Sequence, residues 1–208
     1  MTKEEEINKL YQDYIDRGKR DPYIGPASWI IMDRLIDVVL TYVHGPVVEI
    51  GVGHSTLVLA KHAQQFGVPF LTCDIRPKKC DWVRAVVKYD KLTVFNGKSF
   101  DFMKQYSLPN ASVVFIDGDH HYDVLKVEVD FFLARLLVGG VMFLHDTCPV
   151  QFRFEKHKLK GKNIDTWRAR KDLEKMDNVD VLTWRYTAAE CGLTMVLKKD
   201  MSLPEYRS

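Results

Sequence analysis

Two short polar clusters in this sequence follow apolar, β-rich runs and carry side chains that could do chemistry. The first cluster is Asp117-Gly118-Asp119-His120-His121, and the second is His145-Asp146-Thr147. If both clusters lie at one edge of a sheet, Asp117 and Asp146 would repel each other unless a cation lay between them, and oxygen ligands suit a hard divalent cation. Histidine titrates near neutral pH, so the same clusters also contain groups that can exchange protons.

A third candidate is the stretch from Val47 to Ala60, in which a β-rich run leads through Gly51 and Gly53 into a helix-compatible run. This order predicts a strand, a tight turn and a helix, with Ser55 or Thr56 placed to cap the helix. Glycines let the backbone approach a bound molecule closely, and the free amides of a helix start face the same space. We therefore predict that this turn binds a ligand.

Two common ligands of such turns are disfavoured by the spacing. A dinucleotide fingerprint needs a third glycine where this chain has Thr56. A Walker A loop needs an upstream glycine that the triplet Gly97-Lys98-Ser99 lacks. The sequence therefore argues against a nicotinamide dinucleotide as the ligand of this turn, and against an ATP-hydrolysing enzyme.

The elements that must position these residues follow from an alternation of short apolar runs with amphipathic ones. Strands are predicted at 47–50, 70–73, 92–95, 113–116, 141–144, 179–184 and 193–197. Helices are predicted at about 55–66, 80–89, 100–106, 122–137 and 166–176, after two N-terminal helices at 2–20 and from Ser28 to about 44. Such alternation predicts an α/β fold with a doubly wound, mainly parallel seven-stranded sheet and an antiparallel last strand. Ligands bind such sheets outside the carboxyl ends of the strands.

Composition narrows the classes of protein further. The 208 residues carry a formal net charge of +2, which predicts neither a nucleic-acid coat nor a membrane-surface protein, and no apolar run is long enough to span a bilayer. The four cysteines are scattered, which favours a reduced, cytoplasmic chain. We expect one domain at 1–208, divided into N-terminal helices (1–46), a cofactor-binding core (47–200) and a basic acceptor-side insertion (150–171).

The stretch from Val47 to Leu197 resembles the class I S-adenosylmethionine-dependent methyltransferases. Their first motif is an acidic residue followed by a glycine-rich turn, here E-x-G-x-G-x-S, and their second is an acidic residue that ends the second strand, here Asp74. The resemblance implies a Rossmann-like fold, with the turn around the methionine part, Asp74 on the ribose and Ser99 near the adenine. The implied cofactor-binding residues are Glu49, Gly51, Gly53, Ser55, Asp74, Ser99 and Asp117.

The two polar clusters are similar to those of the metal-dependent O-methyltransferases, a branch with catechol, caffeoyl-CoA, macrolide and cephalosporin-hydroxylase-like groups. The resemblance implies that Asp117 and Asp146 bind a divalent cation such as Mg²⁺ or Mn²⁺. The D-G-x-H spacing of the macrolide group implies that His120 is the general base, whereas His121 is expected to be structural.

This chain departs from both groups beside Asp146. The catechol group has asparagine where Thr147 stands, and the macrolide group has glutamate where His145 stands. Imidazole suits transition metals better than magnesium, so His145 as a third ligand would favour manganese or iron.

The implied reaction is O-methylation of a small hydroxylated acceptor, which the basic segment 153–171 could attract if the acceptor is anionic. Two alternatives remain: a nucleic-acid or protein methyltransferase that uses this basic segment, and a cofactor-binding protein without catalysis. No D-P-P-Y or N-P-P-Y motif is present, which argues against methylation of nucleobases. A homodimer is compatible with the sequence.

Overall fold

The computed structural model describes residues 26–105, 110–148, 165–184 and 192–202, together with the single residues 5, 9 and 12. Apart from those three positions, the predicted helix at 2–20 lies outside the described residues. Most of the predicted basic insertion, from 150 to 164, lies outside them as well.

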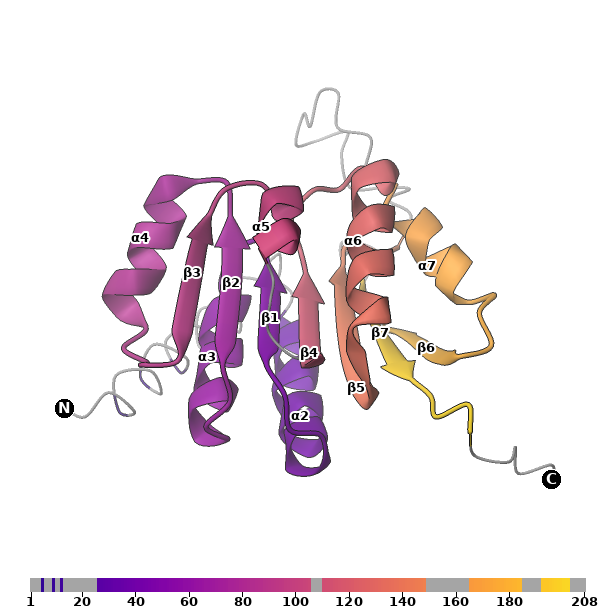
Figure 1. Cartoon of the computed structure of the whole chain (residues 1–208), viewed down its shortest axis with the longest axis horizontal. Coiled ribbons are helices and arrows are strands. Elements are labelled where there is room, and N and C mark those ends of the chain that lie inside the picture. The colour runs from indigo at the N-terminus through magenta and orange to yellow at the C-terminus, as the bar shows by residue number, and fades with distance from the viewer. Residues whose placement is uncertain are drawn as a thin grey trace.

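Seven strands form one sheet in the order β3-β2-β1-β4-β5-β7-β6 (Figure 1). Their bounds are β1 Val47–Ile50, β2 Phe70–Asp74, β3 Leu92–Asn96, β4 Ala111–Ile116, β5 Leu136–His145, β6 Val179–Trp184 and β7 Leu193–Lys198. Strands β1 to β5 run parallel, and β7 is antiparallel to both β5 and β6. The predicted Rossmann-like sheet with an antiparallel last strand is confirmed.

Six helices of the described region flank the sheet (Figure 1): α2 Pro26–Tyr42, α3 Ser55–Gln65, α4 Pro77–Val86, α5 Ser99–Gln105, α6 Tyr122–Ala134 and α7 Trp167–Leu173. Both α2 and α4 begin at a proline, whose fixed φ suits the first helical position. The prediction that Ser28 caps α2 is wrong, because the helix already begins at Pro26.

The core lies on both faces of the sheet, because successive strand residues point to opposite sides. Val47, Phe70, Val113 and Phe143 are buried with residues of α2, α3 and α4. Val48, Leu71, Val114 and Met142 are buried with residues of α5, α6 and α7. Burial on both faces explains why these strands read as continuous apolar runs.

The boundary between α6 and β5 differs from the prediction. The helix was expected to span 122–137 and to end at a glycine pair, but it ends at Ala134 and β5 begins at Leu136. Gly139, with φ 76°, and Gly140 lie inside β5, where its pairing with β4 shifts register. The glycines therefore mark an irregularity in a strand instead of a helix end.

The sheet order reverses between β1 and β4, the central neighbours, since the chain runs outward from β1 through β2 to β3 and then returns to β4. Residues that follow β1, β2, β4 and β5 consequently meet at one edge. Among the described residues, no helix is long and apolar enough to cross a membrane.

Candidate active site

The turn after β1 packs directly against the loop after β4. Gly51 has φ 94°, a backbone conformation that favours glycine, and its amide donates a hydrogen bond to the carbonyl of Cys73 at 2.8 Å. A Cβ atom at this position would overlap the backbone carbonyl of Asp117. The predicted ligand turn and the first polar cluster are therefore in main-chain contact.

The buried side chain of Glu49 holds this turn through hydrogen bonds. Its carboxylate accepts hydrogen bonds from the hydroxyls of Ser55 (2.6 Å), Thr56 (2.8 Å) and Thr72 (2.6 Å). Glu49 is 0% exposed and Ser55 is 1% exposed, so both side chains support the turn from inside the protein. The prediction that Ser55 or Thr56 caps α3 is wrong: the N-cap residue is His54, which makes no side-chain cap bond.

Burial raises the pKa of Glu49 to about 7, although the three hydroxyls oppose the shift. Between its ordinary value of 4.5 and about 7, the folded chain therefore binds one more proton here than the unfolded chain. Since the unfolded state binds fewer protons, the free energy of unfolding falls as the pH rises through this window.

We expect Glu49→Gln to remove this pH dependence, because an amide does not ionise. Wild type should lose up to about 3 kcal/mol more stability than the variant between pH 5 and pH 8. Urea unfolding measures the free energy of unfolding of both proteins at the two pH values. Other titrating groups contribute equally to both proteins, so their contribution cancels when the two changes are subtracted. Equal losses in the two proteins would show that Glu49 stays ionised when folded.

Asp74 ends β2 beside the glycine turn. Its Oδ2 accepts a hydrogen bond from the amide of Val52 at 3.0 Å, and its Oδ1 accepts one from the amide of Arg76 at 2.8 Å. The Arg76 guanidinium donates to both oxygens, and Lys79 Nζ lies 3.7 Å from Oδ2. Burial raises the pKa of Asp74, but the hydrogen bonds and charge of Arg76 outweigh it, so the pKa lies below its ordinary value. An ionised hydrogen-bond acceptor thus lies next to the turn.

Ser99 begins α5 just after β3, and its partner is a buried acid on α6. Glu128 is 1% exposed, and burial raises its pKa to about 7 against the hydrogen bond from Ser99. Ser99 therefore lies at the predicted edge of the sheet and is held by α6.

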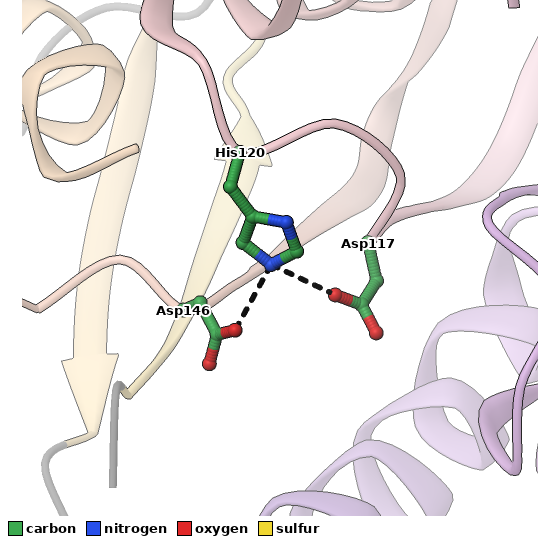
Figure 2. A group of neighbouring side chains, drawn as sticks. All are labelled: Asp117, His120 and Asp146. Atoms are coloured by element: carbon green, nitrogen blue, oxygen red, sulfur yellow. Dashed lines mark hydrogen bonds and ion pairs between the residues drawn. The ribbon is translucent and has the colours of Figure 1, made fainter. Parts of the chain in front are cut away.

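The two polar clusters meet around His120 (Figure 2). The Nε2 atom of His120 lies 2.9 Å from Asp146 Oδ2 and 3.5 Å from Asp117 Oδ1. One ligand atom from each of the three residues lies within 4.8 Å of the others. The hydrogen bonds to Asp117 and Asp146 raise the pKa of His120 to about 9 despite its burial, well above the ordinary value of 6.5.

His145 contacts the same two carboxylates. Its Nδ1 is 3.2 Å from Asp146 Oδ1 and 3.5 Å from Asp117 Oδ1. Burial raises the pKa of both aspartates, but the two histidines outweigh burial and lower these pKa values below the ordinary range. Two carboxylates and two imidazoles are thus arranged in one partly buried group.

Asp146 also has an unusual backbone. Its φ of 57° is the one positive value at a non-glycine residue among those described. Aspartate tolerates this left-handed region better than most residues, yet at a cost in free energy, and such strain gathers at functional sites.

The structure brings Asp117, His120, Asp146 and His145 together, and it places Gly51 and Asp74 nearby. His121 lies apart from this group: its Nδ1 lies 2.6 Å from the carboxylate of Asp119, and both side chains are exposed. Sequence reasoning assigned His120 the role of a base and did not count it among the residues that could hold a cation, as its place between Asp117 and Asp146 allows. The signal was the i,i+3 spacing of Asp117 and His120 in one short loop.

Comparisons with known proteins point to one kind of enzyme. A family model described as a methyltransferase domain matches residues 48–147, which include the glycine turn and both polar clusters. No curated protein matches the sequence.

Several solved structures have the same fold. An O-methyltransferase from Bacillus cereus in complex with SAH is similar with a TM-score of 0.69 and 16% identity, over 94% of this chain and 91% of that one. TomG from Streptomyces achromogenes, an O-methyltransferase of tomaymycin synthesis in complex with SAM, gives 0.65 and 15% over 94% and 90%. MycE, a methyltransferase of the mycinamycin pathway in complex with Mg, SAH and mycinamycin VI, gives 0.55 and 15% over 84% and 50%. Residues 48–147 thus match a methyltransferase domain, and the sheet that carries them has the fold of S-adenosylmethionine-dependent methyltransferases; together they support an enzyme of that class.

Proposed function

We propose that this protein is a metal-dependent O-methyltransferase that acts on a small hydroxylated acceptor. The observation that carries the proposal is the group Asp117, His120 and Asp146, whose ligand atoms lie within 4.8 Å of one another. The loop that bears Asp117 packs on the glycine turn of the donor site. A methyl donor on that turn would therefore lie beside the group that prepares the acceptor.

The donor site is assigned to residues around the turn. The backbone at Gly51 and Gly53 gives close approach to the methionine part, and Glu49 and Ser55 keep the turn in shape. The carboxylate of Asp74 accepts from the ribose hydroxyls after exchange with the exposed side chain of Arg76. Ser99 lies on the adenine side, and the main chain of Asp117 lies beside the turn. We assign these roles as proposals, to be tested residue by residue.

The residues present fit a divalent cation. Asp117 and Asp146 supply hard oxygen ligands, and His145, whose Nδ1 lies 3.2 Å from Asp146, supplies a nitrogen, a set that suits Mn²⁺ as well as Mg²⁺ and leaves His120 to act as a base. A cation held there would lower the pKa of an acceptor hydroxyl that it binds. MycE, solved with Mg, offers a parallel of the same fold.

His120 is the proposed acceptor of the hydroxyl proton. Asp146 and Asp117 hold the ring at hydrogen-bond distance, so its orientation is fixed before an acceptor binds. The same carboxylates raise the pKa of His120 to about 9, so without a cation the ring is protonated at neutral pH and cannot accept the hydroxyl proton. Positive charge between the carboxylates would weaken their hold on the proton, so cation binding and the ability of His120 to act as a base are linked.

A nucleic-acid or protein methyltransferase is the second candidate, through the basic segment 153–171. In the described part of that segment, Arg168 pairs with Asp165, and Arg170 and Lys171 pair with Glu174. These pairs reduce the positive charge open to a phosphate backbone, which favours the small acceptor. A cofactor-binding protein without turnover is the third candidate.

Thermal unfolding in the presence of ligands tests the proposal. Binding to the folded state stabilises it, so S-adenosylmethionine and S-adenosylhomocysteine should raise Tm and nicotinamide dinucleotides should not. Methyl transfer to a panel of vicinal diols, catechols and hydroxy acids should stop with a chelator and return with Mg²⁺ or Mn²⁺. Stabilisation by nicotinamide dinucleotides alone, or turnover that ignores the chelator, would contradict the assignment.

We further propose one domain and a cytoplasmic location. A single sheet joins elements from β1 to β7, and Cys73, Cys80 and Cys148 are buried free thiols, as a reducing compartment allows. A homodimer stays a prediction, which sedimentation would test.

A further inference from the structure

Asp165 and Thr166, which precede α7, are hydrogen-bonded to the backbone of both polar clusters. The amide of Asp165 donates to the carbonyl of His120 at 3.2 Å. The hydroxyl of Thr166, which is 2% exposed, donates to the carbonyl of Asp146. Asp165 and Thr166 thus hold the main chain of His120 and Asp146. The side chains of those two residues make the shortest contact of the group, 2.9 Å.

The side chain of Asp165 reaches the same loop from a second direction. Its Oδ1 accepts a hydrogen bond from the amide of Tyr122 at 2.6 Å, at the first residue of α6. The N-cap residue of α6, His121, makes no side-chain cap bond, so Asp165 supplies that acceptor from 43 residues away. The loop is therefore fixed on both sides of His121.

A third contact orients Asp165 itself. The guanidinium of Arg168 donates to Oδ2 of Asp165 at 3.2 Å and lies over the ring of Tyr122, 4.0 Å from its centroid. Helix α7, which carries Arg168, lies beside α6 (Figure 1). Both carboxylate oxygens of Asp165 are thus engaged, and its position depends on the packing of α7 on α6.

We propose that Asp165 is a positioning residue for His120. It fixes the loop from Asp117 to Tyr122 so that the His120 ring stays between its two carboxylates. The expected effect on turnover rests on the proposed function. The position of the His120 ring does not, because the protein sets it before a methyl donor or a methyl acceptor binds. A displacement of about 1 Å in such a group can lower a rate about 100-fold.

The test compares three variants of the full chain. Asp165→Ala removes the acceptor of the Tyr122 amide and should lower kcat about 10- to 100-fold, with the affinity for S-adenosylhomocysteine unchanged. Asp165→Asn keeps an Oδ1 acceptor and should restore most of kcat. Asp172→Asn is the matched control, because Asp172 accepts from the hydroxyl of Tyr122 and touches neither His120 nor its loop backbone.

The second readout needs no turnover. In nitrogen-15 spectra of the metal-free protein at fixed pH, the ring signals of His120, assigned with His120→Gln, should shift in Asp165→Ala and match wild type in the other two variants. If Asp165→Ala does not fold, Arg168→Ala serves instead, because it removes the guanidinium that orients the carboxylate of Asp165, and the His120 signals should shift in the same direction.

The outcomes are separable. Unchanged ring signals together with unchanged kcat in Asp165→Ala would overturn the positioning role, and so would equal losses in Asp172→Asn. If wild type transfers no methyl group to any acceptor, the proposed function fails, while the ring signals still decide the role of Asp165.

Discussion

Replacing Asp146 with asparagine should lower the rate of methyl transfer about 1,000-fold while S-adenosylhomocysteine still binds. The carboxylate of Asp146 holds His120 Nε2 at 2.9 Å and His145 Nδ1 at 3.2 Å, and it supplies a charge to the proposed cation site. Asparagine has nearly the same shape and tolerates the φ of 57°, so the backbone should stay in place. Single-turnover rates and calorimetric binding of the cofactor product measure the two effects separately.

Asp119→Asn is the matched control for this prediction. Asp119 lies in the same loop as His120, but its carboxylate is exposed and pairs with His121 at 2.6 Å. Its rate should stay close to that of wild type. A variant Asp146→Asn that keeps a tenth or more of the wild-type rate would refute the role of this carboxylate.

Gly51→Ala should destabilise the chain by about 3 kcal/mol and abolish binding of S-adenosylmethionine. A Cβ atom there meets the carbonyl of Asp117, and the φ of 94° is strained for any side chain. The main chain on both sides is fixed by hydrogen bonds, since Gly51 donates to Cys73 and Asp117 donates to Ile50. Relief of the overlap would therefore move the turn away from the polar cluster.

Gly67→Ala separates the cost of the backbone conformation from the cost of the overlap with Asp117. Gly67 also has a positive φ, 64°, but no atom lies within 4 Å of its Cβ position. Its loss should be only about 1 kcal/mol, the cost of the backbone conformation alone. Equal losses in the two variants, by urea unfolding, would show that contact with Asp117 contributes nothing.

Much of the fold was predictable because buried parallel strands are short apolar runs. The prediction of β1 at 47–50 agrees with its observed bounds, Val47–Ile50. The start of β5 was not predictable, since Leu136 to Val138 suit a helix as well as a strand and the glycine pair resembles a helix end. Pairing with β4 decides the matter, and that is a tertiary interaction.

The site was predictable in part for a similar reason. Asp117, His120 and Asp146 follow strands directly, so the order of strands and helices brings them to one edge. The contact of Asp165 with Tyr122 spans 43 residues and has no periodic or spacing signal. The raised pKa of His120 was missed as well, because it depends on two carboxylates whose distances only a folded chain defines.

The left-handed backbone of Asp146 has a consequence for the history of such chains. Glycine at this position would relieve a strain of about 1 kcal/mol, so selection for stability alone favours the loss of the carboxylate. On the proposed role of Asp146, a copy that must catalyse keeps the acid, whereas a duplicated copy under no such demand would change to glycine here early. The residue at position 146 should therefore distinguish descendants of this chain that still catalyse from those that have lost catalysis.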